Sequence, residues 1–344
     1  MPLDEIVKPV IRWFTENRKE LPFRQNRTPY SIWISEIMLQ QTRIETVIPY
    51  YLRFIREFPD VAALAAADPD RLMKLWEGLG YYSRARNLKK AAEKVVQEYG
   101  GQLPADAKAL KSLPGIGEYT AGAIASMAFG LPVPAVDGNV LRVITRVTAD
   151  FSDISEAATK KKITRMLAEV YPTGEEAAKL TEGLMEIGET VCLPVAEPKC
   201  GLCPLFGICL AKKQGIANQL PVLPERKARK KEQLTVFLLR YGDTFALCKR
   251  TRGMLKETFE FPNCPGHLSR QQVAEKFGIP REQVVLLGAS RHIFTHREWE
   301  MIGYEIPLPK PLPEYRFETA SQILSRYAVP SAFRAYKVYL EKFV

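Results

Sequence analysis

Apolar residues recur at intervals of three and four along the first two-thirds of the chain, which is the spacing that gathers side chains on one face of a helix. The spacing is clear in two triplets: Ile34, Ile37 and Met38, and Leu72, Leu75 and Trp76. Helix-breaking pairs interrupt it at Phe58-Pro59, Asp68-Pro69, Leu113-Pro114 and Tyr171-Pro172. The pattern predicts an all-α domain over residues 1–220, with Asp68 and Ser112 near helix ends.

The pattern changes after residue 220. Two prolines and a run of positive charge fill residues 221–231, as expected for a linker, although such a run could also grip phosphates. Beyond it, residues 234–241, 245–248 and 283–287 are predicted as short strands, and Gly242 lies in the turn between the first two. We therefore predict a second, α+β domain over residues 232–344.

Length and charge fit this division. A chain of 344 residues is long enough for two independently folded domains. Its longest apolar runs, such as 121–127, fall far short of the roughly 20 residues of a membrane-spanning helix, so we expect no membrane partner and a cytoplasmic location, nucleoid-associated in a bacterium. The net charge of +10 favours a polyanionic partner such as nucleic acid, but many ordinary soluble proteins are also basic.

Four of the six cysteines lie in one short segment, with the spacing C-x7-C-x2-C-x5-C: Cys192, Cys200, Cys203 and Cys209. Clustered cysteines in an intracellular chain bind metal more often than they form disulfides. Four thiolates can complete a tetrahedral zinc site or hold an iron-sulfur cluster, and spacing alone does not decide between them.

A glycine-rich segment, LPGIGEYTAG, occupies residues 113–122. Gly115 and Gly117 allow a tight hairpin between two helices, and the free amides at the start of the second helix could hold a phosphate. An ordinary helix connection is the plainer interpretation of so short a pattern. Twenty residues after Gly117, Asp137 stands beside a glycine at the entry to another apolar helix.

This combination resembles the helix-hairpin-helix glycosylase superfamily, in which an LPGxG hairpin is followed by an essential aspartate, matched here by Asp137. Two longer segments, ISEIMLQQT at 34–42 and GLGYYSRARN at 78–87, resemble adenine DNA glycosylases of the MutY type. The resemblance implies that Glu36 protonates adenine, that Tyr81 wedges into the duplex and that Gln40 and Gln41 lie near the lesion. It also implies active-site support from Tyr119, Asn139 and Glu182, and DNA contacts from Gly115, Gly117 and Arg84.

Excision of a base makes two opposite demands on a site. Breaking the N-glycosidic bond leaves a cationic sugar and an anionic base, so one group must give a proton and another must supply negative charge. We expect buried Glu36 to be the acid and ionised Asp137 to be the stabiliser. Related lyases of the endonuclease III type carry a lysine at the position of Tyr119; without that amine we expect base removal without efficient strand cleavage.

The resemblance extends to the cysteines and to the second domain. It favours one 4Fe-4S cluster on the loop 192–209, with one more residue than usual in the first gap. Residues from about 233 to 344 resemble the Nudix-like domain that MutY-type proteins carry, and 252–262 resemble its LLxxLWEFP segment. The glutamate-rich helix of a Nudix hydrolase does not follow that segment. In that family a loop matching Phe294, Thr295 and His296 recognises 8-oxoguanine.

We therefore predict a monofunctional base-excision repair enzyme, acting as a monomer on double-stranded DNA with adenine opposite 8-oxoguanine or guanine. A glycosylase/lyase for oxidised pyrimidines and a DNA-damage binding protein without catalysis are the alternatives. Tyr119 and the long second domain oppose the lyase, and the presence of both Glu36 and Asp137 opposes the non-catalytic protein.

Overall fold

The computed structural model describes residues 3–224 and 228–344, and the chain divides into two compact units. The first comprises residues 1–66 and 87–225, and the second comprises 67–86 and 226–344. The second unit thus includes a short segment from within the helical part of the sequence. The predicted boundaries 1–220, 221–231 and 232–344 stay a prediction, and three residues of the predicted linker, 225–227, lie outside the described residues.

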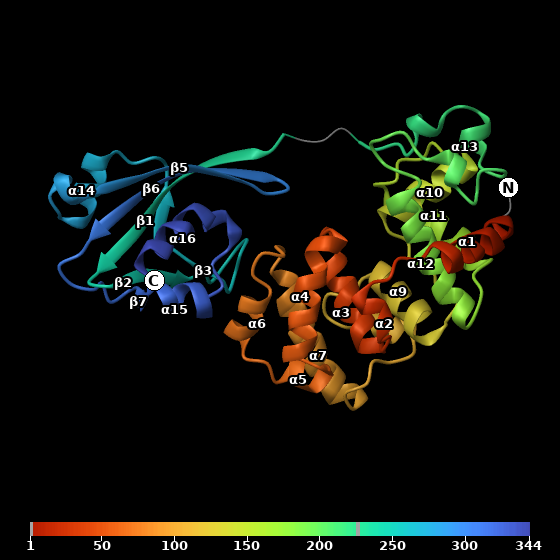
Figure 1. Cartoon of the computed structure of the whole chain (residues 1–344), viewed down its shortest axis with the longest axis horizontal. Helices are drawn as coiled ribbons and strands as arrows, with labels where there is room; N and C mark the ends of the chain where they lie inside the picture. The colour runs from red at the N-terminus through yellow and green to blue at the C-terminus, as the bar shows by residue number, and fades with distance from the viewer. Residues whose placement is uncertain (1–2, 225–227) are drawn as a thin grey trace. The chain divides into compact units, whose positions relative to one another are not determined.

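The first unit is built of helices and two single 3₁₀ turns (Figure 1). Its α-helices are α1 (Asp4–Asn17), α2 (Pro22–Gln25), α3 (Pro29–Leu39), α4 (Ile44–Glu57), α5 (Val61–Ala65), most of α7 (Ser83–Tyr99), α8 (Ala107–Lys111), α9 (Glu118–Phe129), α10 (Gly138–Thr148), α11 (Ala157–Ala168), α12 (Glu175–Thr190) and α13 (Leu210–Lys213).

Short polar side chains set where several helices begin. The Thr28 hydroxyl accepts from the amide of Ser31 and the Ser31 hydroxyl accepts from the amide of Thr28, forming a capping box at the start of α3. Asp106 and Asp137 each accept a backbone N–H at the starts of α8 and α10. The prediction that Asp68 and Ser112 lie near helix ends is confirmed. Asp68 is the N-cap of α6 (Pro69–Leu75), and Ser112 is the C-cap of α8.

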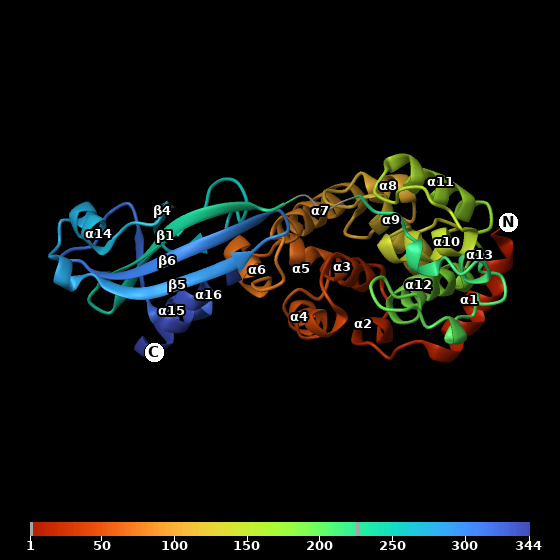
Figure 2. The ribbon, with the colours of Figure 1, turned by 90° about the horizontal axis from the view of Figure 1, so that it is seen from above.

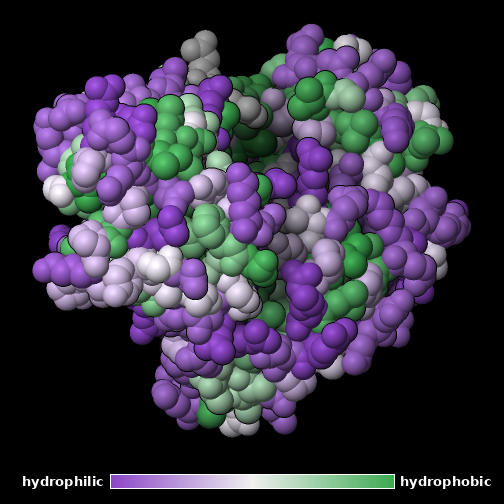
Figure 3. All heavy atoms as spheres, turned by 60° about the vertical axis from the view of Figure 1, so that its left-hand side comes forward, coloured by the Kyte–Doolittle hydropathy of each residue, from purple (hydrophilic) through white to green (hydrophobic). Residues whose placement is uncertain are grey.

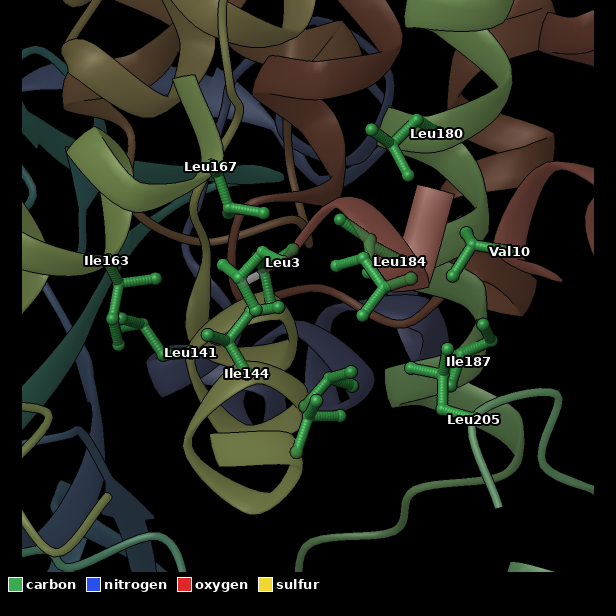
Figure 4. Close-up of a cluster of buried hydrophobic side chains, with 14 of the residues drawn as sticks. Leu3, Val10, Leu141, Ile144, Ile163, Leu167, Leu180, Leu184, Ile187 and Leu205 are labelled. Carbon is green, nitrogen blue, oxygen red and sulfur yellow. The ribbon is translucent and has the colours of Figure 1, made fainter. Parts of the chain in front are cut away.

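One apolar cluster of this unit lies among α1, α10, α11 and α12 (Figure 4). Val10 from α1, Ile144 from α10, Leu167 from α11 and Leu184 from α12 are at most 1% exposed. Leu205, from the cysteine-rich loop, is also fully buried there. The helices that carry Asp137 and Glu182 therefore share one core with the cysteine loop.

The second unit contains a seven-stranded sheet with the central order β3-β2-β1-β6-β5, while β4 pairs with β1 and β7 with β2. The strands are β1 (Lys230–Tyr241), β2 (Thr244–Lys249), β3 (Phe259–Glu260), β4 (Asn263–Pro265), β5 (Val285–Ile293), β6 (Arg297–Pro307) and β7 (Arg316–Thr319). The helices are α6, α14 (Arg270–Phe277), α15 (Ala320–Arg326) and α16 (Arg334–Leu340).

Alternation along β1 explains how helices cover both faces of this sheet. Val236 and Leu238 pack in a cluster with Ile323 of α15, whereas Phe237 and Leu239 pack in another with Val273 of α14. Figure 2 shows β1, β6 and β5 side by side, with α14 apart from α15 and α16. Because helices bury both faces of the sheet, residues 236–239 of β1 are all apolar, and polar residues do not alternate with them.

Residues 67–86 contact the C-terminal helices within the second unit. The Lys74 ammonium donates to the carbonyl of Leu324 at 2.7 Å and to that of Tyr327 at 3.0 Å. Glu77 forms ion pairs with Lys74 and with Lys337. These contacts join α6 to α15 and α16 across about 250 residues of sequence.

The expected fold class is confirmed: a helical domain is followed by an α+β domain. Strand β5 begins two residues later than predicted, because residues 281–283 form a 3₁₀ turn, and β6 was not predicted. None of the described helices is long and apolar enough to cross a membrane. Figure 3 shows a mainly hydrophilic surface with dispersed apolar patches on the face in view.

One glycine in α9 provides a test of the helix packing. A Cβ atom added at Gly122 would lie 2.2 Å from the carbonyl oxygen of Pro134, and backbone cannot rotate out of the way as a side chain can. We expect Gly122→Ala to lower the free energy of unfolding by about 1–3 kcal/mol and the melting temperature by roughly 2–4 °C per kcal/mol. Gly207→Ala, where a Cβ meets nothing within 4 Å, is the control. Equal melting temperatures for the two variants would contradict this packing.

Candidate functional site

A cavity of about 200 Å³ lies in the first unit among α3, α9, α12 and the start of α10. It is smaller than the roughly 300–1,000 Å³ of pockets for drug-sized ligands, and this size suits one heterocyclic base rather than a whole nucleotide. Its polar lining includes most of the predicted catalytic residues: Glu36, Tyr119, Asp137, Asn139 and Glu182. The fold therefore brings together residues that are far apart in sequence.

Glu36 lies on the buried face of α3 with only 7% of its surface exposed. The Tyr119 hydroxyl donates a hydrogen bond of 2.6 Å to its Oε2 atom. The pKa of Glu36 is raised to about 7, mainly by burial; the Tyr119 hydrogen bond opposes this rise, and the nearby carboxylates of Glu182 and Asp137 add to it. A carboxyl group with this pKa can hold a proton near neutral pH and release it to a bound base.

Asp137 is the N-cap of α10. One of its carboxylate oxygens accepts the amide of Val140 at 2.8 Å, and the other accepts the side-chain amide of Asn139 at 2.9 Å. Burial raises the pKa of Asp137, and these hydrogen bonds to its ionised form oppose the rise. Because both oxygens are held, the carboxylate has a fixed orientation toward the cavity.

An ion-pair network that sequence analysis missed forms another wall of the cavity. The Arg24 guanidinium contacts Glu182 at 3.0 Å and Glu186 at 2.8 Å, and Arg27 contacts Glu182 at 2.8 Å. Glu182 and Glu186 are four residues apart on the buried face of α12. Two acids four residues apart lie on the same face of a helix, and if that face is buried they require basic partners. This spacing is the feature of the sequence that could have predicted the network.

The glycine-rich hairpin forms as predicted between α8 and α9. Gly115 has φ +79°, and a Cβ there would lie 2.6 Å from Cβ of Asn87, so the position requires glycine. Gly117 is the N-cap of α9, with nothing within 4 Å of its Cβ position. The amides at the start of α9 are therefore open to a ligand.

Two predicted DNA-contact residues have left-handed backbone conformations, which is unusual for residues other than glycine. Gln41 has φ +58° and Tyr81 has φ +45°, and both side chains are exposed. Gln40 is instead half-buried, and its side chain donates to the Thr120 hydroxyl at 3.2 Å.

Arg84 contacts the backbone of the 78–81 loop. Its side chain is buried, and its guanidinium donates to the carbonyl of Leu79 at 2.9 Å and that of Gly80 at 3.2 Å. Burial lowers its pKa to about 10. These two hydrogen bonds support the 78–81 loop, and the predicted DNA contact of Arg84 stays a prediction.

Phe294, Thr295 and His296 form the turn between β5 and β6. Phe294 packs edge-on against Trp299, with ring centroids 4.8 Å apart, and His296 is exposed. Within this same unit, the Thr295 hydroxyl hydrogen-bonds the Tyr81 hydroxyl. Two residues predicted independently to meet damaged DNA thus lie together.

The four clustered cysteines line one small, mainly apolar cavity. The Arg146 guanidinium contacts Sγ of Cys192 at 3.2 Å, and the Cys209 thiol donates to the Arg146 carbonyl. Among the described residues, no three acidic, histidine or cysteine side chains are close enough to share one metal ion. The four thiols therefore surround one common space, as residues that hold a metal centre would.

Arg142 joins this loop to Asp137 through hydrogen bonds. Its guanidinium donates to the carbonyls of Cys192 and Gly188, each at 2.7 Å, and to the side-chain oxygen of Asn139 at 2.8 Å. Asn139 in turn donates to Asp137. The hydrogen bonds form a continuous path from the first clustered cysteine to the aspartate.

Two family models match the chain. Residues 34–173 match the HhH-GPD superfamily of base excision DNA repair proteins, which covers the hairpin and Asp137. Residues 235–337 match the NUDIX domain, which covers the sheet of the second unit. The matched ranges agree with the helical and α+β parts of the fold.

Similar proteins support the same assignment. Adenine DNA glycosylase of Buchnera aphidicola from Acyrthosiphon pisum is 35% identical over 74% of this chain and 72% of its own length. The Mus musculus adenine DNA glycosylase is 40% identical over 63% of this chain and 44% of its own. A solved endonuclease III–DNA complex is 25% identical with a TM-score of 0.52, over 62% of this chain and 96% of its own. The chain therefore belongs to the adenine DNA glycosylase family.

Proposed function

We propose that this protein binds double-stranded DNA and removes adenine paired with 8-oxoguanine or guanine, by hydrolysis after the base has been flipped out. The observation that carries the proposal is the buried Glu36 carboxyl group, hydrogen-bonded by Tyr119 and facing a base-sized cavity that Asp137 also lines. Membership of the adenine DNA glycosylase family supports adenine as the base.

The chemistry divides between the two carboxyl groups. Glu36 gives its proton to N7 of adenine, so that the electrons of the C1′–N9 bond leave with a neutral base. Ionised Asp137 stabilises the positive charge that develops on the sugar. Water then adds to C1′ and releases a proton, leaving free adenine and an abasic site. Asn139 and Arg142 are positioning residues that hold Asp137.

Strand cleavage by a lysine is not part of the proposed reaction. A Schiff base requires an amine near C1′, and Tyr119 stands where the lyases carry lysine. Among the described residues lining the base cavity there is no lysine. We therefore expect a monofunctional glycosylase, and a protein that formed a borohydride-trapped complex with DNA in full yield would contradict this part.

Recognition of the opposite base is assigned to the second unit. Tyr81 and the turn 294–296 present two hydroxyls, a histidine and an aromatic ring in one place. A duplex kinked by Tyr81 would bring the base opposite adenine to these groups, which can hydrogen-bond its imidazole edge.

The cysteine loop is proposed to hold one 4Fe-4S cluster through Cys192, Cys200, Cys203 and Cys209. When bound, the cluster supplies rigid cross-links among the four thiolates. Cys192 follows directly on α12, and Arg142 bonds its carbonyl, so the same cross-links fix the end of the helix that carries Glu182.

The pH dependence of excision tests the role of Glu36. Because only the protonated carboxyl group can donate, we expect the single-turnover rate on an A:8-oxoguanine duplex to fall as pH rises through about 7. Glu36→Gln should lose at least about 100-fold in rate, and Glu176→Gln, on an exposed position of α12, should retain it. A wild-type rate that is constant between pH 6 and 9 would sink the assignment.

Stability provides an independent readout of the same group. The pKa of Glu36 is about 7 in the folded protein, above the ordinary value of 4.5 for a glutamate, so between pH 4.5 and 7 the folded state binds more protons than the unfolded state. The protein therefore loses stability as pH rises through this range. Above pH 7, Glu36→Gln should therefore have a higher free energy of unfolding than wild type, by at most roughly 3 kcal/mol. Denaturant titration measures this difference. The difference should vanish near pH 4.

Cofactor analysis tests the cysteine site. We expect four iron and four sulfide per chain, loss of most iron in Cys209→Ala, and full iron in Cys264→Ala, which alters a cysteine outside the cavity. Since cluster binding stabilises the fold, Cys209→Ala should also melt at lower temperature. One tightly bound zinc per chain would show that the cluster assignment is wrong.

Substitution of the turn histidine tests lesion recognition. His296→Ala should reduce the preference for adenine opposite 8-oxoguanine over adenine opposite guanine by about tenfold, the value of one lost hydrogen-bonded contact. His267→Ala, which alters an exposed histidine bonded to the Glu300 carbonyl, should leave the ratio unchanged. An unaltered ratio in His296→Ala would remove this residue from the recognition site.

A further inference from the structure

A second cavity of the first unit adjoins the base cavity. It has a volume of about 640 Å³ and lies between the hairpin and α9 on one side and α11 on the other. Tyr119 and Asp137 line both cavities. The proposed catalytic aspartate therefore stands in the wall between a small, base-sized space and a larger groove, which we call the flanking groove.

Lysines line the flanking groove. Lys111 at the end of α8 and Lys160 in the first turn of α11 border it, and the next residue, Lys161, acts electrostatically on Glu118. Lys160 is exposed and forms no ion pair with any residue in the described parts of the chain. An exposed, unpaired ammonium beside a catalytic aspartate suits an anionic ligand rather than a neutral one.

Glu118 is the acidic residue that faces these lysines. It is the first residue of α9 and lies 2.6 Å from the ammonium of Lys111, with 67% of its side chain exposed. Lys111 lowers the pKa of Glu118, so the pair is ionised at neutral pH. Exposed pairs of this kind contribute little to stability, and a stronger anion can displace the carboxylate from the lysine.

The continuity of the DNA strand indicates which anion would bind in the flanking groove. If adenine fills the small cavity, its sugar lies against Asp137, and the strand must leave over the residues that border the cavity. The flanking groove begins at those same residues and carries positive charge. A phosphodiester adjacent to the flipped nucleoside would meet Lys160 first and would compete with Glu118 for Lys111.

We propose that the flanking groove binds the phosphodiester next to the flipped adenosine, that Lys160 contacts this phosphate, and that Glu118 weakens binding by competing for Lys111. This inference rests on the proposed glycosylase function. It adds a strand-binding residue outside the hairpin and an acidic residue that limits DNA affinity, which favours release of the product strand.

The test measures binding as a function of salt. The probe is a duplex with 2′-fluoro-2′-deoxyadenosine opposite 8-oxoguanine, which resists excision because fluorine destabilises the sugar cation. Wild type, Lys160→Gln, Lys160→Arg, Glu118→Gln and the control Lys8→Gln, on an exposed position of α1, are compared between 50 and 200 mM salt. Each phosphate contact contributes about 0.9 to the slope of log affinity against log salt.

We expect Lys160→Gln to bind more weakly at 50 mM salt and to have a slope smaller by about one, so that its deficit shrinks about threefold by 200 mM. Lys160→Arg should restore the slope because it keeps the charge, and Glu118→Gln should bind more tightly than wild type. Equal slopes for Lys160→Gln and Lys8→Gln, or weaker binding by Glu118→Gln, would overturn the proposal.

A parallel assay separates this proposal from the function on which it rests. At saturating enzyme, wild type and the control Lys8→Gln should release adenine from the unmodified duplex at rates within about twofold of one another, because Lys8 lines neither cavity. Absence of adenine release by wild type would refute the glycosylase function itself. Normal release with unchanged salt slopes would refute only the role of the groove.

Discussion

The buried guanidinium of Arg142 is the interaction on which the first unit most depends. A buried cation is tolerated only when its donors are satisfied, and Arg142 meets this need with carbonyls from α12 and the cysteine loop and with the side chain of Asn139. Each partner belongs to a different element of the site. The same charge therefore holds the end of α12, the first clustered cysteine and, through Asn139, the orientation of Asp137.

Burial imposes an opposite demand at Glu36. Glu36 holds its proton near neutral pH because burial destabilises its charged form, and the Tyr119 hydrogen bond offsets part of that cost. On the adjoining wall, Arg24 pairs with Glu182 and Glu186, and its positive charge lowers the pKa of Glu36 while the charge of Glu182 raises it.

Sequence predicted the features that depend on local chemistry. Helical periodicity, proline breaks and the glycines of the hairpin identified most of the first unit, and the motif containing Asp137 indicated its place at the entry to α10. What could not be predicted depends on pairing at a distance. The Arg24 network, the burial of Arg84 and the parallel pairing of β1 with β6 join residues whose local patterns carry no information about the partner.

The contacts of α6 have a consequence for synthesis of the chain. Lys74 bonds the carbonyls of Leu324 and Tyr327, which leave the ribosome about 250 residues later, after the whole of the first unit has been made. The first unit can therefore complete its core during translation, whereas the 67–86 segment gains its final partners only when the last helices emerge. Nascent chains truncated before α15 would carry the finished core of the first unit together with a 67–86 segment that lacks its C-terminal partners.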